Sequence, residues 1–263
     1  MLDACRRLPL DADVRHGCGR ADCSASCLGA RLARADFGAW MRVLAWALVD
    51  GPAHGLHVSA RQVVDAGLAG MAVVGLSLAD ADARRLCHLV LTRVHRLAAA
   101  EGLGAAVLHV LRHGVAPSLD RSAPFDARLG RVHALLLAEA LPVALRPAHA
   151  LWRCVAELCI DGRGALCSLG AVVSRLVGRP PGPGERLVRE ASWLLACVEG
   201  ALRGCAGHAA VRDEALRAGV DAHAAALVLH LRGAEGASGV VRQARRVLRR
   251  LCPEWHAAFS LAL

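Results

Sequence analysis

Arginines recur at helical spacing near the C-terminal end of this chain, in the segment VVRQARRVLRRL. Four of them share one face of a helix predicted over residues 239–251: Arg242, Arg245, Arg246 and Arg249. The opposite face is apolar: Val241, Ala244, Val247, Leu248 and Leu251. Guanidinium groups donate several planar hydrogen bonds to phosphate, so the basic face is a candidate nucleic-acid contact. The same pattern fits a solvated helix face or one that meets an acidic protein.

A second group of residues, in HGCGRADCSASC, has the side-chain types of a zinc site: His16, Cys18, Cys23 and Cys27. Its C-x4-C-x3-C spacing differs from the C-x2-C knuckle that is usual for structural zinc. We expect no metal here and a reduced N-terminal segment.

The sequence contains no motif typical of nucleotide binding or of a catalytic serine. EGLGAAV and GPGERL contain glycine pairs without the spacing of a phosphate-binding loop, and Ser238 in GAEGASGVV fits a helix start better than a nucleophile elbow. Isolated histidines are expected to be structural: His88, His95, His133 and His230. We therefore expect a protein that is not an enzyme, with no cofactor and no small-molecule substrate.

Composition narrows the class of protein further. The 263 residues are 55% hydrophobic, yet the longest charge-free apolar stretch, Ala66–Ala79, is shorter than the roughly 18 residues of a membrane span. The N-terminus lacks the apolar region of a signal peptide, so we expect an intracellular protein without a membrane partner. Its eleven cysteines then predict reduced, buried thiols.

The formal net charge of +9 comes from arginine, because lysine is absent. Lysine, asparagine and tyrosine are all missing, as in a strongly GC-biased coding sequence, so some arginines reflect codon usage. The charge permits an anionic partner such as RNA without identifying it.

Helical periodicity runs through almost the whole chain and predicts an all-α fold without strands. Helices are expected at 36–49, 59–66, 68–76, 79–99, 102–113, 126–145, 148–160, 164–177, 185–203, 208–218, 220–232 and 239–251. The clearest loops are predicted at 116–126 and 178–186, where prolines cluster.

The stretch GLSLADADARRLCHLVL becomes an amphipathic helix at this period, with Ser77 as the predicted N-cap and a start near Leu78. Its apolar stripe is Ala83, Leu86, Cys87, Val90, Leu91, Val94 and Leu97. Four arginines lie off that stripe, where solvent or a partner reaches them: Arg84, Arg85, Arg93 and Arg96.

Helices of this kind, joined by short turns, favour pairwise stacking into an irregular HEAT/armadillo-like solenoid. The pairs recur at roughly 30–40 residues, within the range of such repeats. We expect residues 1–35 to be poorly structured and residues 36–263 to form the α-helical repeat domain.

Three segments resemble, in the same order, the C-terminal region of the nucleolar pre-ribosomal-associated protein family. The first, VVDAGLAGMAVVGLSLADADARRLCHLVL, carries Gly67, Leu68, Leu76, Ser77, Asp82 and Arg84. The second, LLLAEALPVALRPAHALW, carries Pro147, His149, Leu151 and Trp152. The third, REASWLLACVEGAL, carries Glu190, Trp193, Leu194, Leu195, Gly200 and Leu202.

The resemblance covers roughly residues 40–230 and departs at LGAVVSRL, where the family usually has a Pro-Leu-aromatic element. It implies a non-enzymatic scaffold in nucleolar assembly of the large ribosomal subunit, acting in early pre-60S particles and pre-rRNA processing. The implied partners are ribosome-assembly proteins and pre-rRNA. The alternative function is a HEAT/armadillo-type adaptor in transport or signalling, with protein partners alone.

Overall fold

The computed structural model describes residues 25–119, 128–160, 168–177, 184–203, 208–231, 234 and 236–253. These residues form α-helices and one short 3-10 helix, with no strand among them. The first half contains α2 (Ala25–Val49), η1 (Gly51–His54), α3 (Ala60–Asp65), α4 (Leu68–Gly75), α5 (Ala81–Ala100), α6 (Ala105–Leu119) and α7 (Arg131–Ala144). The second half contains α8 (Trp152–Ile160), α9 (Leu169–Val177), α10 (Gly184–Leu202), α11 (His208–Arg217), α12 (Val220–His230) and α13 (Ser238–Leu251).

The predicted all-α class is confirmed for these residues, and most helix ends fall within a few residues of the predicted ones. Four ends differ more, and two of them are the starts of α7 and α9, which were predicted at 126 and 164 and lie at Arg131 and Leu169. α2 begins at Ala25, inside the segment predicted to be poorly structured, and α6 continues to Leu119, inside the loop predicted at 116–126. The remainder of that loop, 120–126, and residues 178–183 of the other predicted loop lie outside the described residues.

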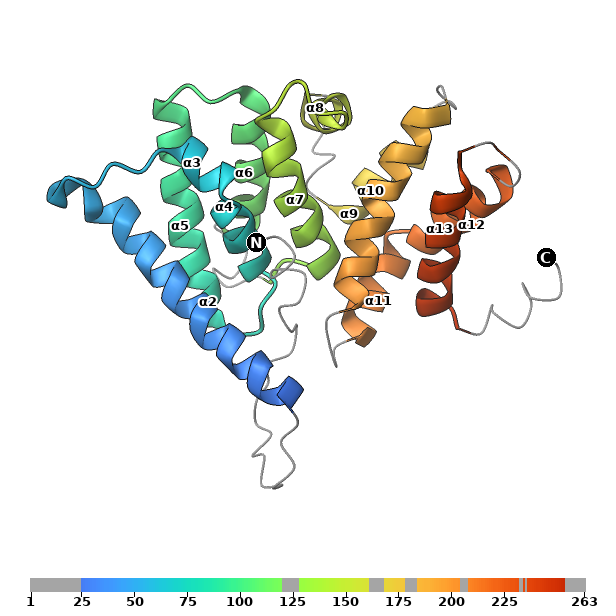
Figure 1. The fold of residues 1–263 in the computed structure, drawn as a ribbon, viewed down its shortest axis with the longest axis horizontal. Coiled ribbons are helices and arrows are strands. Elements are labelled where there is room, and N and C mark those ends of the chain that lie inside the picture. The colour runs from blue at the N-terminus through green and yellow to red at the C-terminus, as the bar shows by residue number, and fades with distance from the viewer. Residues whose placement is uncertain are drawn as a thin grey trace.

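The helices follow one another along the long axis of the molecule (Figure 1), from α2 at one side to α12 and α13 at the other. α2 packs on α5, α4 packs on α7, α7 on α10, and α10 on α13. Buried side chains from Phe37 to Cys252 form one continuous hydrophobic core along this row. The core therefore joins the two halves of the chain.

α7 lies at the centre of this row and is buried on almost every side. Its N-cap, Gly130, has no side chain, and Glu214 of α11 supplies the missing cap from outside the helix. The Glu214 carboxylate accepts hydrogen bonds from the backbone N–H of Val132 at 3.1 Å and of His133 at 3.0 Å. A side chain distant in sequence thus satisfies donors that the first turn of a helix leaves open.

The start of α5 corrects the predicted cap. Asp80 is the N-cap, and its Oδ1 accepts from the backbone N–H of Asp82 at 2.9 Å and of Ala83 at 3.2 Å. Ser77 is instead fully buried, where its hydroxyl donates to the Val74 carbonyl at 2.7 Å and accepts from Arg131 Nη1 at 3.2 Å. α5 therefore begins at Ala81, a few residues later than predicted, because the Asp80 carboxylate is the group that accepts from the backbone N–H groups of its first turn.

Arg84 also differs from its predicted position in solvent. It is only 7% exposed, and its Nη1 donates to the backbone carbonyls of Leu78 at 2.8 Å and Ala79 at 2.5 Å. The guanidinium folds back over the turn before α5, so it is a structural group. Arg85 and Arg96 are exposed as predicted, whereas Arg93 is half-buried.

Candidate nucleic-acid interface

α13 is positioned by its apolar face, as the sequence pattern predicts. Ala244, Val247, Leu248 and Leu251 are buried, and Val241 packs at the edge of the core. The helix lies against α10 and α12. Ser238 is its first residue, in agreement with the predicted helix start. The polar, arginine-bearing face is consequently left toward the outside of the molecule and the flank of α10.

The structure divides the four predicted contact residues into different environments. Arg242 and Arg249 are exposed. Arg245 is half-buried, its Nε is buried without a hydrogen-bond acceptor, and its backbone carbonyl accepts from Arg249 Nε at 3.4 Å. The prediction that all four arginines lie on an exposed face is therefore wrong for Arg245, because its side chain is half-buried.

Arg246 is held by an acid on α10. Its Nε donates to Glu199 Oε1 at 3.1 Å and its Nη2 donates to Oε2 at 3.5 Å. Arg203 Nη2 pairs with the same Glu199 Oε1 at 2.8 Å. Burial alone would raise the pKa of Glu199, but the hydrogen bonds and charges of Arg203 and Arg246 outweigh it and lower that pKa. The ion pair of Arg246 with Glu199 therefore joins α13 to α10, while the Arg246 side chain stays 47% exposed.

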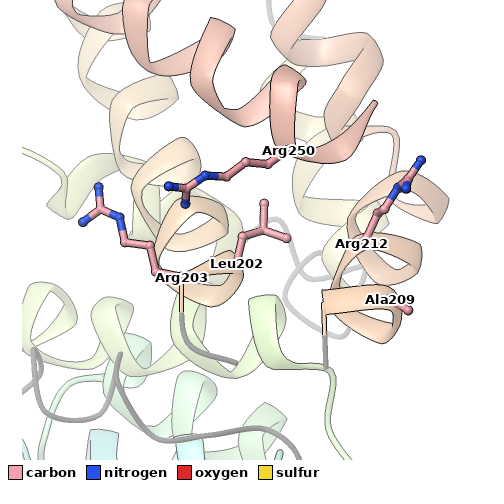
Figure 2. A pocket seen from close by; sticks show the side chains of 5 residues that line it. All are labelled: Leu202, Arg203, Ala209, Arg212 and Arg250. Carbon is pink, nitrogen blue, oxygen red and sulfur yellow. The ribbon is translucent and has the colours of Figure 1, made fainter. Parts of the chain in front are cut away.

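A basic pocket adjoins this ion pair where α10 ends, α11 begins and α13 ends. It has a volume of about 520 Å³ and is lined by Leu202, Arg203, Ala209, Arg212 and Arg250. Figure 2 shows Arg203 and Arg250 on one side of the pocket and Arg212 on the other. The ends of α10 and α13 and the first half of α11 thus place three arginines along one hollow, where leucine and alanine supply the apolar part of the lining.

Sequence reasoning missed this pocket. Arg250 could have been added to the basic face from the sequence, because it lies four residues, about one helical turn, after Arg246. Arg203 and Arg212 belong to the end of α10 and to α11, and their approach to α13 depends on how the helices pack. The pocket is therefore a tertiary feature that adds to the predicted basic face.

Metal-ligating side chains do not cluster in the part of the chain that the structure describes. No group of three or more histidine, cysteine or acidic residues there is arranged to hold a metal ion. The N-terminal segment in which we expect no metal lies outside the residues whose side chains are described; it contains His16, Cys18, Cys23 and Cys27. Among the single histidines, His88 and His133 are buried, His95 is half-buried and His230 is exposed.

Five cysteines are buried in the part of the chain whose side chains are described: Cys87, Cys154, Cys159, Cys197 and Cys252. Burial raises the pKa of the Cys159 thiol to about 12 and raises that of Cys87 as well. These two thiols remain protonated at neutral pH and are poor nucleophiles. They serve as small packing residues in the core.

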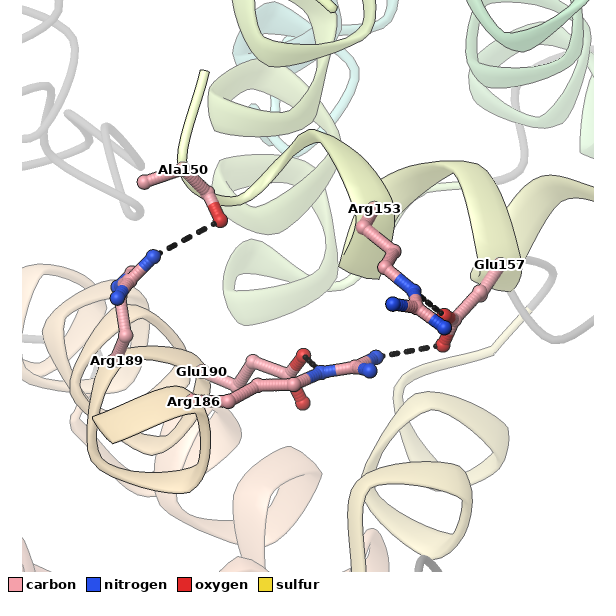
Figure 3. A network of polar contacts seen from close by, with 6 residues as sticks. All are labelled: Ala150, Arg153, Glu157, Arg186, Arg189 and Glu190. Carbon is pink, nitrogen blue, oxygen red and sulfur yellow. Dashed lines mark hydrogen bonds and ion pairs between the residues drawn. The ribbon is translucent and has the colours of Figure 1, made fainter. Parts of the chain in front are cut away.

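A network of polar contacts joins α8 to α10 (Figure 3). Arg186 of α10 bridges two acids, donating from Nε to Glu190 and from Nη2 to Glu157, each at 2.7 Å. Arg153 also donates to Glu157, at 2.9 Å, and Arg189 donates to the Ala150 carbonyl at 3.3 Å. Glu157 and Glu190 offset part of the positive charge of Arg153 and Arg186 in this network.

Comparison of the chain with protein-family models, with curated proteins and with solved structures finds no match. Among the described helices, none has both the length and the apolar character to cross a membrane. The fold and the basic region together define an all-helical protein with an arginine-lined surface at one end.

Proposed function

We propose that this protein is a non-enzymatic helical scaffold that binds RNA through the basic surface of α10, α11 and α13. The basic pocket carries the proposal. Arg203, Arg212 and Arg250 surround it, and exposed Arg242 and Arg249 continue the positive charge along α13. Glu199 compensates part of this charge through Arg203 and Arg246. Several guanidinium groups along one helical edge suit the repeated phosphates of a polynucleotide.

The scaffold part of the proposal is a HEAT/armadillo-like solenoid. The succession of contacts from α4 through α7 and α10 to α13 supports it, because each of these helices packs on the next along the long axis. A stacked row of helices exposes a long surface on which many weak contacts form together.

The cellular setting of the proposal comes from the resemblance of the three segments to the nucleolar pre-ribosomal-associated protein family. Two residues of the third segment have structural roles that fit a scaffold: Leu194 is fully buried, and Glu190 belongs to the network that fixes α10. We propose that the RNA is pre-rRNA, that the protein partners are assembly factors of the large ribosomal subunit, and that the protein acts in the nucleolus.

The test is the salt dependence of RNA binding by a variant that removes three exposed arginines of α13, Arg242, Arg249 and Arg250, by changing each to Gln. We expect the slope of log affinity against log salt for single-stranded pre-rRNA to flatten by up to about 2 units, at about 0.7 per phosphate contact. Glutamine retains good helix propensity and removes the charge. Fluorescence polarisation over a series of salt concentrations measures the slope.

A matched control changes Arg85, Arg93 and Arg96 of α5 to Gln, which removes the same charge from a different surface. Its slope should stay near that of the parent protein. Equal slopes for the parent protein and the α13 variant would reject this surface as the RNA contact. Recovery of pre-rRNA with the tagged parent protein, and its loss with the α13 variant, would extend the test to the cell.

The adaptor function remains the second candidate because of one observation. The outward face of α2 exposes large apolar side chains, among them Trp40 and Trp46. An adaptor for protein partners alone would recover proteins without pre-rRNA in the same experiment, and the α13 variant would leave that recovery unchanged.

A further inference from the structure

α2 carries an apolar surface that its own fold does not use. Its inner face packs on α5 through buried side chains such as Phe37, Met41 and Leu44. Its outer face exposes 59% of Trp40, 57% of Val43, 47% of Trp46 and 37% of Val49. In Figure 1, α2 lies at the edge of the row of helices, with α5 behind it. Large apolar residues clustered at such an edge mark an interaction site more often than chance exposure does.

The charges on this face exclude a phosphate-binding role and suggest a self-complementary one. Between Phe37 and Asp50 the chain has two charged residues, Arg42 and Asp50. Both are exposed. The face has no net charge, so it offers a polynucleotide no electrostatic attraction. A partner should instead present apolar surface together with one acid and one base.

A second copy of α2 presents this combination in the required order. Arg42 and Asp50 each lie four residues from Trp46, on opposite sides of it, and Val43 and Val49 each lie three residues from it. In an antiparallel pair with a two-fold axis at Trp46, residues whose numbers are equally far from 46 lie at the same height. Arg42 then faces Asp50 of the other copy, and Val43 faces its Val49. Four residues span about 6 Å along a helix, so both ion pairs lie close to the axis.

We propose that α2 binds α2 of a second copy of this chain in an antiparallel, two-fold symmetric homodimer centred on Trp46. Trp46 is already held in place, because its ring stacks on His54 of η1 at 5.9 Å between centroids with 24° between the planes. A pre-positioned aromatic side chain loses little conformational freedom on binding. One helix face is smaller than the roughly 800 Å² per partner of a standard interface, so the dimer is weak and reversible.

Sedimentation velocity of the full chain, free of nucleic acid, over a range of micromolar concentrations measures the association. We expect a reversible monomer–dimer equilibrium. Arg42→Glu and Asp50→Arg should each weaken it by about tenfold or more, because each places like charges together at both ends of the pair. Arg96→Glu, which makes the same charge change on exposed α5 surface, should leave it unchanged.

Mixing the two single variants provides the sharper measurement. In the mixed dimer, the glutamate introduced at position 42 of one copy faces the arginine introduced at position 50 of the other copy. At the opposite end of the pair, the unchanged Asp50 of the first copy faces the unchanged Arg42 of the second, so both pairs are attractive. The mixture should therefore associate although neither variant does so alone. Circular dichroism on each variant verifies that the exposed substitutions leave the helices folded.

Three outcomes would overturn the proposal. These are a parent chain that stays monomeric throughout the range, a dimer that both charge reversals leave intact, and folded single variants that fail to associate when mixed. If this face instead binds RNA or another protein, the parent chain should stay monomeric and the mixed single variants should fail to associate.

Discussion

Gly130→Ala tests the contact between Glu214 of α11 and the start of α7, one of the contacts between the two halves of the molecule. A Cβ atom at this position would lie 2.9 Å from Glu214 Oε2 and still closer to its Oε1 and Cδ. The backbone itself accepts alanine, because Gly130 has φ −60° and ψ 145° in the ordinary extended region. The added methyl group should therefore push the Glu214 carboxylate out of its place at the start of α7 without straining the main chain.

The expected loss of stability follows from the backbone N–H groups that lose their acceptor when the Glu214 carboxylate moves away. Glu214 accepts from the backbone N–H groups of Val132 and His133, and loss of a side-chain cap costs about 0.5–2 kcal/mol. Hydrogen bonds to charged groups contribute more, about 1.5–3 kcal/mol. Burial raises the pKa of Glu214 although these backbone donors oppose it, so part of the gain is offset by desolvation. Alanine restricts the unfolded chain and returns about 0.4–1 kcal/mol. The net expected loss is about 2 kcal/mol.

Urea denaturation followed by circular dichroism measures this loss, and a double-mutant cycle assigns it. In a Glu214→Ala background the obstructing carboxylate is gone, so Gly130→Ala should be neutral or stabilising by about 0.5 kcal/mol. Glu214→Gln should be milder than Glu214→Ala, since the amide oxygen still accepts a hydrogen bond. An equal loss in both backgrounds would show that Glu214 is not the group displaced, and no loss in the parent protein would refute the cap.

Three further predictions concern stability. Leu194→Ala should cost about 2–5 kcal/mol because Leu194 is fully buried, whereas Leu86→Ala should cost clearly less because Leu86 is only partly buried; denaturant melts compare them. Glu199→Gln should destabilise the protein at pH 7 and remove part of its acid sensitivity. The lowered pKa of Glu199 stabilises the fold above the unfolded value near 4.5, and this stabilisation is lost as pH falls through the folded value. Thermal melts of this variant and the parent protein at pH 7 and pH 4 compare the two. His223 is buried and its pKa is lowered by burial, so the unfolded chain takes up a proton below about pH 6.5 that the fold resists. His223→Leu should therefore reduce the loss of thermal stability between pH 7 and pH 5, and an unchanged pH profile would contradict this role.

Local sequence sufficed for the helices and their inward faces. The apolar stripe of α13 and the buried residues Cys87, Val90 and Leu91 of α5 follow from a 3.6-residue period, which depends on near neighbours alone. Leu86 lies farther out than its place in the stripe predicted, because it is only partly buried. Periodicity identifies a face of the helix, whereas the exposed fraction depends on how closely the next helix approaches.

The ends of helices were decided partly by distant groups. Ser77 and Asp80 both have N-cap side chains, and sequence alone favoured the serine. The structure instead buries Ser77 beside Arg131, fifty-four residues later, which leaves Asp80 to cap α5. Likewise, Gly130 offers no cap of its own, and Glu214 supplies it from α11. Such choices depend on contacts that a short segment does not contain.

The basic surface shows the same division. The sequence by itself determined that α13 is amphipathic, that its polar face is arginine-rich and that the chain is helical, because these properties arise from residue type and spacing within one segment. Only the tertiary structure decided which guanidinium groups remain available. Packing of α13 on α10 brings Arg246 to Glu199 and brings Arg250 to a pocket with Arg203 and Arg212. A charge on a predicted face is open or engaged according to the groups that the neighbouring helices place beside it, and those helices lie far away in sequence.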